Sequence, residues 1–413
     1  MREVESAEKY EVVVREYEAE KDRSGAEAVD RMCDVSPSGG VSLFMDHLGD
    51  PVCRVRNSPA FLMLVAETCG PGNGEIVGVI RGCVKTITCG KTTPRSSAGG
   101  GMAAGEAVPI FTKAAYILGL RVSPSHRRMG IGLKLVKRLE DWFRSNDAEY
   151  SYMATDKSNL ASLRLFTHHL NYTKFRTPRI LVHPVFAGHR LPLPSSTTLL
   201  HLPPSSAESL YRRIFSTTEF FPRDIDSILN NPLSLGTFLA YPTQSFSYTT
   251  IHHFLTRPPK SWAVLSVWDS SSLLQFELRG VPRLKKGMAW TTRAVDKAVP
   301  WLRIPSVPDL FSPFGGYFLY GIGGEGPEAD KMLRVLCRNA HNMAREGGCR
   351  VVATEVAAGE PLVKGIPYWR SLSFEEDLWC VKRLADEYRD GAVVGDWTRS
   401  VPGTSIFVDP REV

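Results

Sequence analysis

The chain has 413 residues and a formal net charge of +6, and 43% of its residues are hydrophobic and 23% charged. These values exclude a disordered chain, and the length predicts two globular domains, because it exceeds what one hydrophobic core usually serves. The apolar run over 61–66 is too short for a membrane helix, and the acidic first residues lack the basic head of a signal peptide. We therefore expect a protein that lies inside the cell and off the membrane.

Cysteine and charge patterns exclude two further classes of site. The eight cysteines are dispersed, without a C-x-x-C pair or a zinc-like His/Cys spacing, which predicts reduced, buried thiols and no metal. Residues 1–30 carry ten acidic and five basic side chains, whereas residues 121–138 carry six basic side chains and no acidic one. The basic segment indicates a local anion site rather than a surface that binds nucleic acid directly.

The first half predicts alternating strands and helices, with a hairpin near its start and a mobile insertion, rich in glycine, serine and alanine, over 88–110. The helix after the third long strand is amphipathic, because Ile131, Leu135, Leu139 and Trp142 recur at helical spacing. In chain order we expect strand 12–17, helix 24–33, strands 61–67 and 75–87, strand 114–122, the amphipathic helix, strand 150–155 and helix 159–170.

A proline-rich linker over 186–197 separates this domain, 1–185, from a second one, 198–413. The second domain predicts the same order of elements without obvious sequence identity to the first. We expect strand 198–202, helices 207–215 and 223–229, strands 236–240, 262–268, 273–279 and 317–320, a glycine loop, helix 329–345 and strand 350–356.

Arg127, Arg128, Gly130 and Gly132 form a loop between a predicted strand and the amphipathic helix. Glycines let backbone amides approach a ligand, and a helix N-terminus adds partial positive charge, so the loop is a candidate phosphate site. The alternative is that the glycines only shape a tight turn and the arginines are solvated.

Two motifs in this order resemble the GCN5-related N-acetyltransferase (GNAT) superfamily. Arg127-x-x-Gly130-x-Gly132 is similar to its Arg/Gln-x-x-Gly-x-Gly/Ala signature, and Asn159-x-x-Ser162-x-x-Leu165-Phe166 followed by Asn171-Tyr172 is similar to the motif of its next helix. The resemblance implies an α/β fold of the α+β type, with a mixed twisted sheet flanked by helices. It also implies two GNAT-like domains in tandem, of which the second is a degenerate copy. The implied co-substrate is acetyl-CoA, and no metal is implied.

The resemblance implies roles for individual residues. Backbone amides from Arg128 to Leu133 would hold the pyrophosphate of acetyl-CoA, and the strand backbone at Leu120, Arg121 and Val122 would pair with the pantetheine arm. An amide of Leu120 or Val122 would polarise the thioester carbonyl. Asn159 would contact pantetheine, or else serve as a helix N-cap. The implied cofactor-binding set is Leu120, Arg121, Val122, Arg127, Arg128, Met129, Gly130, Ile131, Gly132, Leu133, Asn159 and Phe166.

Two positions depart from the family pattern. Phe166 stands where the family's tyrosine donates a proton to the leaving thiolate, and Tyr116 where several relatives carry a glutamate base. Without a base, the chemistry favours an α-amine over a lysine, because more of an α-amine is neutral at pH 7. Asp156 is the first candidate substitute and Glu67 the second, although Asp156 is alternatively a turn residue. His168 and His169 are expected at the surface.

The run Gly321-Ile-Gly323-Gly-Glu-Gly326 formally matches a dinucleotide fingerprint. The acid that should follow about 20 residues later is misplaced, and the preceding elements do not alternate as a Rossmann unit requires. We interpret the run as the counterpart of the first glycine loop, in which Glu325 and Glu328 would repel phosphate.

Residues 216–231, 320–327 and 395–412 resemble the plant Hookless family of N-acetyltransferases. This resemblance implies a nuclear regulator of hormone-controlled growth that acetylates a protein amine, an N-terminus or a lysine, with histones among the candidate substrates. The alternative is a catalytically weak or inactive scaffold that keeps the fold. The basic stretch over 283–286 is either a nuclear import signal or a solvated loop. The oligomeric state is left open.

Overall fold

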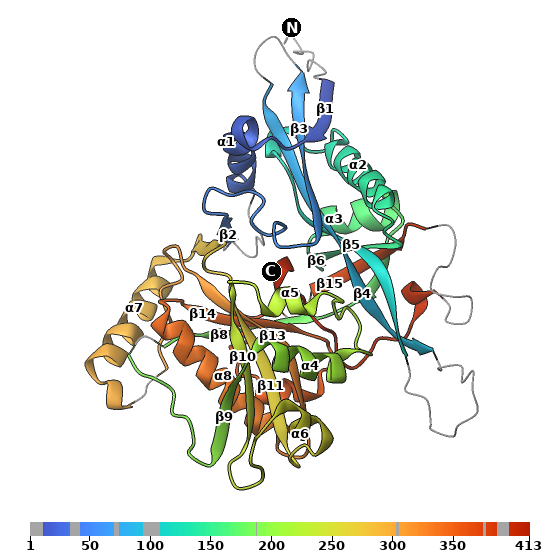
Figure 1. Ribbon diagram of the computed structural model, residues 1–413. Helices are drawn as coiled ribbons and strands as arrows, with labels where there is room; N and C mark the ends of the chain where they lie inside the picture. Colours follow the sequence, from blue (N-terminus) through green and yellow to red (C-terminus); the bar gives the residue numbers. More distant parts are fainter. Residues whose placement is uncertain are drawn as a thin grey trace, which may run out of the picture.

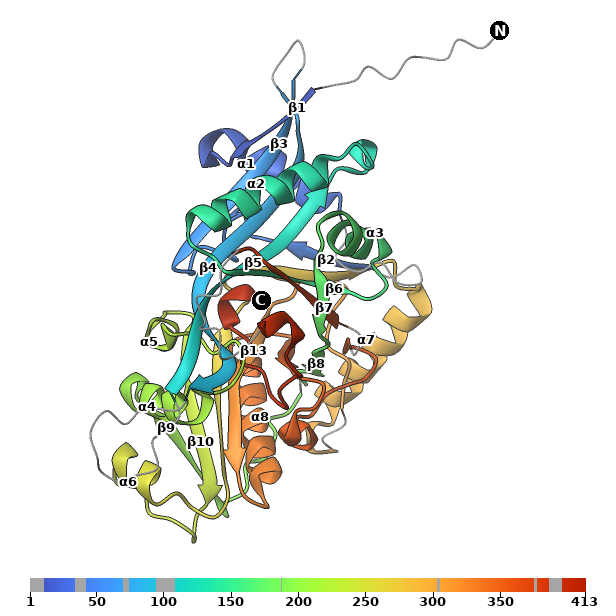
Figure 2. The same ribbon diagram turned by 90° about the vertical axis from the view of Figure 1, so that its right-hand side faces the viewer.

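The computed structural model of the protein describes residues 11–33, 42–69, 74–93, 108–186, 188–302, 305–374, 377–385 and 396–413. Within these ranges, two large mixed sheets lie one above the other in Figures 1 and 2, and the C-terminus lies between them. Helices accompany both sheets. This arrangement confirms the predicted α/β organisation.

The first sheet has the strand order β1-β3-β4-β5-β6-β15-β7. Its neighbouring strands are antiparallel except β5 and β6, which run parallel. Apolar, β-branched sequences form these strands because their side chains pack on both faces of a covered sheet. The strands are β1 (Glu11–Glu16), β3 (Ala60–Cys69), β4 (Ile76–Thr93), β5 (Val108–Val122), β6 (Tyr150–Asp156), β15 (Asp377–Arg383) and β7 (Thr173–Arg176).

Two helices cover opposite faces of the first sheet. Helix α1 (Ala19–Arg31) packs through Ala26 and Val29, and α2 (Ile131–Ser145) packs through its predicted apolar stripe. Close packing of α2 depends on Gly82 of β4, because an added Cβ there would lie 2.7 Å from the Phe143 ring. The short helix α3 (Leu160–Arg164) continues as a π-helical turn over Leu165–His169.

The second sheet has the order β8-β14-β13-β11-β10-β9. Read from β9 to β8, the second sheet repeats the order of the first. Its parallel pair, β13 and β14, corresponds to β5 and β6. Helix α8 follows β13 as α2 follows β5. Its strands are β9 (Thr197–Leu202), β10 (Ser234–Pro242), β11 (Trp262–Asp269), β13 (Gly316–Glu325), β14 (Val351–Val356) and β8 (Arg179–Pro184), and its helices are α4 (Pro204–Phe215), α5 (Ile225–Leu229), α6 (Ile251–Thr256), α7 (Arg283–Ala298) and α8 (Ala329–Glu346).

The two halves exchange strands. Strand β15 comes from the end of the chain and lies between β6 and β7, whereas β8 precedes the predicted linker and pairs with β14 in the second sheet. Strands β2 (Ser42–Asp46) and β12 (Gln275–Arg279) form a further two-stranded sheet between the halves. The two large sheets therefore do not follow the predicted division into 1–185 and 198–413, because each sheet contains a hydrogen-bonded strand from the other half of the chain.

Three local expectations differ from the structure. The predicted insertion over 88–110 contains paired strand at 88–93 and 108–110, and 94–107 lie outside the described residues. The second glycine run is not a loop, since β13 continues through Glu325 and pairs with β11. A Cβ at Gly321 would lie 2.4 Å from the Tyr211 hydroxyl, so this glycine permits packing rather than phosphate contact. The basic stretch over 283–286 opens helix α7.

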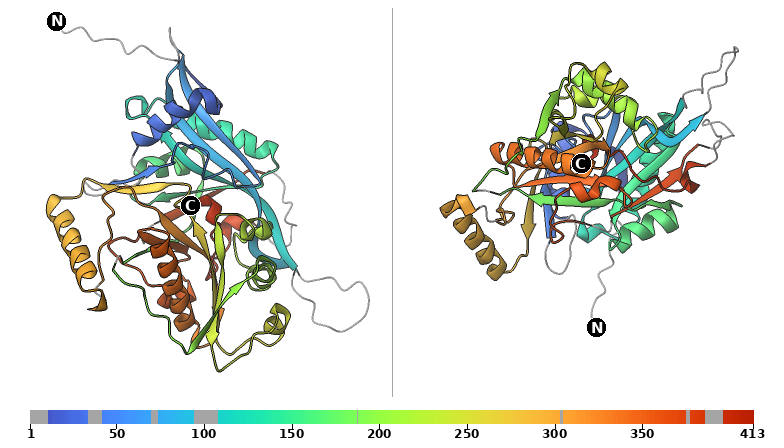
Figure 3. Two further views of the ribbon diagram at one scale, coloured as in Figure 1. Left: turned by 60° about the vertical axis from the view of Figure 1, so that its left-hand side comes forward. Right: turned by 90° about the horizontal axis from the view of Figure 1, so that it is seen from below.

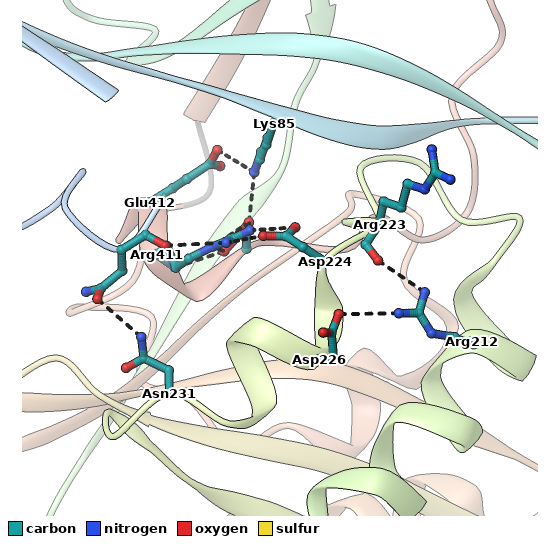
Figure 4. Close-up of polar contacts among 10 residues, drawn as sticks. Lys85, Arg212, Arg223, Asp224, Asp226, Asn231, Arg411 and Glu412 are labelled. Carbon is teal, nitrogen blue, oxygen red and sulfur yellow. Dashed lines mark hydrogen bonds and ion pairs between the residues drawn. The ribbon is translucent and has the colours of Figure 1, made fainter. Parts of the chain in front are cut away.

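The C-terminal segment joins the halves at the centre of the molecule (Figures 3 and 4). Lys85 of β4 pairs with Asp409 at 3.1 Å and with Glu412 at 2.5 Å. Arg411 pairs with Asp409 at 2.7 Å and with Asp224, which precedes α5, at 2.6 Å. Lys85, Asp409, Arg411 and Glu412 are buried. Buried charges require such compensation, so this ion network specifies where the chain end lies.

Candidate active site

The parallel strands β5 and β6 separate at their carboxyl ends. Within the described strands, the last pair between them is Ile117 opposite Met153. Strand β5 nevertheless continues to Val122, and β6 to Asp156. Backbone groups along a strand edge accept an extended ligand as an added strand, so the gap is suited to a linear molecule.

A β-bulge in β5 lies beside this gap. Arg81 pairs with Leu118 but Val79 pairs with Arg121, so Gly119 and Leu120 together oppose one residue of β4. Gly119 has a φ of +61°, a left-handed conformation that glycine adopts without a Cβ penalty. Leu120 of the bulge and the strand end that follows it, Arg121 and Val122, are the backbone that we predicted to hold pantetheine.

Helix α2 begins at Ile131 next to the end of β5. Its N-cap residue, Gly130, has a φ of +78°, and no side chain in the described part of the chain caps the first turn. First-turn amides have no acceptor within their helix, and the helix dipole favours an anion in front of them. Among the described residues, no atom lies within 4 Å of a Cβ added at Gly130, so they leave the space there open. At Gly132 a Cβ would lie 3.9 Å from both Leu120 and Val122, which places the loop against the strand end.

The arginines of this region have different surroundings. Arg127 is exposed, with its Nε 3.5 Å from the Val122 carbonyl oxygen, and Arg128 is also exposed. Arg121 turns inward and its guanidinium lies 3.1 Å from the buried carboxylate of Asp30. Arg127 and Arg128 are thus the cations that a phosphate could recruit, whereas Arg121 can offer only its backbone. The structure brings both predicted cofactor segments, 120–122 and 127–133, together at one end of the sheet.

Asp156 and Asn159 lie across the gap, where β6 leads into α3. The Asp156 side chain accepts a hydrogen bond of 2.6 Å from the Ser158 amide, as a turn residue does. The Asn159 side chain accepts one of 3.1 Å from the Ser162 amide, so it is the N-cap of α3. Both residues thus take the local roles that the sequence left open, and their roles toward cofactor and substrate stay predictions.

Two predicted site residues lie in unsuitable surroundings. Phe166 is 1% exposed and packs edge-on against Tyr172 at 5.1 Å, so its ring belongs to the core rather than to a cofactor surface. Glu67, the second candidate base, pairs with Arg15 at 2.6 Å. This hydrogen bond holds the pKa of Glu67 below its ordinary value, which makes it a poor proton acceptor.

Tyr116 lies on the face of the first sheet opposite α2. It is buried and stacks on Tyr152 of β6, with ring centroids 4.8 Å apart. Burial raises the pKa of the Tyr116 hydroxyl well above its ordinary value, and the carboxylates of Glu412 and Glu355 act in the same direction. A phenol that stays protonated at neutral pH cannot serve as the base that the family's glutamate provides.

A pair of carboxyl groups lies on this face that the sequence did not predict. Glu355 of β14 and Asp377 of β15 are hydrogen-bonded to each other, and the Trp379 indole nitrogen donates to Glu355 at 3.0 Å. Burial, followed by repulsion from Asp377, raises the pKa of Glu355 well above its ordinary value. Burial also raises the pKa of Asp377 to about 6. No sequence spacing indicated the pair, because its members belong to different sheets.

The described residues contain no group of three or more His, Cys, Asp or Glu side chains that could hold a metal ion. All eight cysteines are free, and all except Cys69 are buried. His168 and His169 are exposed, as predicted. In this part of the chain, no helix combines the length and apolar character that crossing a membrane requires.

Comparisons with known proteins agree with this geometry. The model of the Acetyltransferase (GNAT) family matches residues 50–172, which include the gap and the start of α2. The chain is 57% identical over 410 residues to "Probable N-acetyltransferase HLS1-like" of Arabidopsis thaliana, covering 97% of this chain and 99% of that protein. It is also 57% identical over 407 residues to "Probable N-acetyltransferase HLS1" of the same plant, with the same coverage.

A solved structure shares the fold over most of the chain. N-myristoyltransferase of Saccharomyces cerevisiae with bound myristoyl-CoA gives a TM-score of 0.51 at 11% identity, covering 90% of this chain and 79% of that one. At this identity the likeness concerns the fold alone. Identity over nearly the whole length of HLS1-like and HLS1 is the stronger finding. The chain therefore belongs to the acetyltransferase (GNAT) family of enzymes, together with these N-acetyltransferase relatives.

Proposed function

We propose that the protein transfers the acetyl group of acetyl-CoA to an amine of a protein substrate. The observation that carries this proposal is the uncapped first turn of α2, open in front of Gly130 and placed beside the separated ends of β5 and β6. The gap suits a linear arm, the helix start suits a diphosphate, and acetyl-CoA contains both.

Each part of the site has a role in this proposal. Acetyl-CoA, when bound, supplies the acetyl group as a reactive thioester. The amides from Arg128 to Leu133 hold its pyrophosphate, and Arg127 adds positive charge. The backbone of 120–122 pairs with the pantetheine arm. An amide of that segment donates to the thioester oxygen, which is worth about 10²–10³ in rate for a fixed donor.

Calorimetry with acetyl-CoA tests the binding half of the proposal. Gly132→Asp sets a carboxylate against the pyrophosphate, and an added Cβ makes only ordinary contacts of 3.5 Å or more, so the fold should tolerate it. We expect affinity to fall at least about tenfold, which is about 1.4 kcal/mol. Gly287→Asp on α7, where an added Cβ meets no atom within 4 Å, is the matched control. Equal affinity in wild type and Gly132→Asp would refute the loop assignment.

The substrate part of the proposal is a protein amine, either an N-terminus or a lysine, in the nucleus and in hormone-controlled growth, with histones among the candidates. The names of the relatives support N-acetyl transfer. The remaining parts depend on the resemblance of residues 216–231, 320–327 and 395–412 to the Hookless family. Acetylation of a peptide panel and localisation of a tagged full-length chain test it. A non-catalytic scaffold is the second candidate, favoured by the protonated phenol of Tyr116 and the apolar ring of Phe166. Acetyl-CoA binding without product on any amine would favour the scaffold.

A further inference from the structure

The strand exchange brings an acidic group from the second half of the chain to the face of the first sheet that the substrate would approach. Trp379 of β15 lies opposite Ala154 of β6, and Asp377 lies opposite Asp156. Trp379 belongs to the same buried cluster as Tyr116 and packs against Tyr152, with ring centroids 5.7 Å apart. Asp377 is two residues from Trp379, so its side chain lies on the same face of β15.

Glu355 reaches this face from the other sheet. It lies near the end of β14, where its carboxylate accepts the Trp379 indole hydrogen bond at 3.0 Å and contacts Asp377. Beside it is a small cavity of about 10 Å³, lined by the ends of β13 and β14 and by residues 406–408. Glu355 is half-buried and Asp377 is 9% exposed, so the pair is shielded without being sealed.

We infer that Glu355 and Asp377 together form the proton acceptor for the attacking amine, in place of the glutamate that Tyr116 replaces. This inference rests on the proposed acetyl transfer. Tyr116 stacks on Tyr152, and Tyr152 packs against Trp379. Because the Trp379 indole donates to Glu355, ring contacts connect the pair to the family's usual base position although it belongs to other strands. The pair is thus a base assembled from the two halves of the chain.

The charge of the pair fits an amine that arrives as ammonium. Two carboxyl groups in contact share one proton and keep one negative charge at neutral pH, because two adjacent charges repel. Among the described residues, the ionisable groups that act on the pair include Asp156 and Glu412, which oppose further negative charge, and the protonated phenol of Tyr116 is itself affected by Glu355. Their combined effect keeps the pair basic enough to accept a proton near pH 7.

The proton balance of the step is complete. The ammonium gives one proton to the carboxyl pair, and the free nitrogen lone pair forms the C–N bond to the acetyl carbon as the C–S bond breaks. Sulfur leaves with the bonding electrons, and the second nitrogen proton passes to it. The pair then returns its proton to water.

The first test needs no cofactor. In full-length protein labelled with ¹⁵N-tryptophan, the Trp379 indole signal, identified by its loss in Trp379→Phe, should titrate with a midpoint near 6. That titration should disappear or move by about one pH unit or more in Asp377→Asn. It should stay unchanged in Glu360→Gln, which alters another buried acid beside the same space. If the chemical shift of the Trp379 indole does not change with pH, or titrates in Asp377→Asn as it does in the wild type, the carboxyl pair is refuted.

The second test measures transfer. Glu355→Gln keeps the shape of the side chain and its acceptor for Trp379, and should lower kcat by about 10²-fold or more at pH 7 while acetyl-CoA affinity in calorimetry stays unchanged. The rise of kcat with pH through about 6 should be lost, and an acceptor amine of low pKa should recover most of the activity, because it needs less help to lose its proton.

The outcomes separate the two proposals. Full kcat in both Glu355→Gln and Asp377→Asn, with normal acetyl-CoA binding, would overturn the base assignment and leave the acetyltransferase standing. Absence of acetyl-CoA binding in the wild type would instead refute the proposed function, and the base assignment with it. If Glu355→Gln does not fold, Asp377→Asn decides the question by the same measurements.

Discussion

Lys85 and Glu412 form an ion pair of 2.5 Å in the interior of the protein, although one lies on β4 and the other next to the last residue of the chain. Figure 4 shows the Lys85 ammonium next to Glu412 and above Arg411. The carboxylate of Asp409 lies 3.1 Å from the same ammonium. Removing one partner of a buried pair leaves an uncompensated charge, which costs more than an exposed pair of the same length contributes.

We therefore expect Lys85→Met to lower the free energy of unfolding by about 3–5 kcal/mol. Lys113→Met on neighbouring β5 is the control, because Lys113 and Asp147 form an exposed pair at 3.3 Å whose loss should cost at most about 1 kcal/mol. Urea unfolding of both variants measures the difference. Equal losses would contradict a structural role for the buried network.

The raised pKa of Asp377 predicts that its contribution to the free energy of unfolding falls as pH rises. An ordinary ion-paired carboxylate has the opposite effect. Its folded pKa is raised from 3.8 to about 6, so ionisation is less favourable in the folded than in the unfolded chain. The stability it contributes is complete below pH 4 and is lost as pH rises through about 6.

Asp377→Asn should therefore be more stable than the wild type at pH 7 by about 2–3 kcal/mol, and equally stable near pH 3. Thermal or urea unfolding at the two pH values checks this. Asp141→Asn, at a side chain that is 64% exposed, should change stability by less than about 0.5 kcal/mol at either pH. A destabilised Asp377→Asn at pH 7 would mean that the carboxylate is favourably paired instead. Stabilisation together with lost transfer is the trade-off expected of a proton-accepting site.

The two glycine runs should respond differently to alanine. A Cβ at Gly321 would lie 2.4 Å from the Tyr211 hydroxyl and the residue has a φ of +59°, whereas a Cβ at Gly130 would meet nothing within 4 Å. Gly321→Ala should lower the unfolding free energy by more than about 2 kcal/mol and leave acetyl-CoA affinity unchanged. Gly130→Ala should cost only the left-handed strain, about 1 kcal/mol, and should weaken acetyl-CoA. Chemical denaturation and calorimetry on both variants separate packing from binding. The reverse pattern would contradict our assignment of the two runs.

Asn159 combines a cap with a predicted cofactor contact, and two substitutions can separate them. Asn159→Asp keeps a side-chain oxygen for the Ser162 amide, so stability should stay within about 0.5 kcal/mol of the wild type. Asn159→Ala loses the cap and should cost about 1 kcal/mol. If the amide NH₂ of Asn159 donates to pantetheine, both variants bind acetyl-CoA more weakly. Unchanged affinity for acetyl-CoA in Asn159→Asp would mean that Asn159 serves only as the N-cap of α3.

Local sequence determined most of the elements and the helix start at which we propose that the cofactor binds. The apolar residues of α2 recur at helical spacing and form one stripe, and Gly130 starts that helix where the signature placed it. Phosphate recognition by a helix start depends on consecutive residues, so a short motif is sufficient to predict it.

Tertiary structure alone decided the strand exchange, the position of the C-terminal segment and the meeting of Glu355 with Asp377. These depend on which strand edges pair and which charges find partners in the interior, and the residues concerned lie far apart along the chain. The spacing of apolar residues shows which face of a segment is buried, but it does not show which distant segment packs against that face. For that reason the sequence offered Asp156 first and Glu67 second as candidate bases, whereas the fold gave Glu67 an arginine partner, gave Asp156 the hydrogen bond of a turn residue and brought a further carboxyl pair to the proposed site.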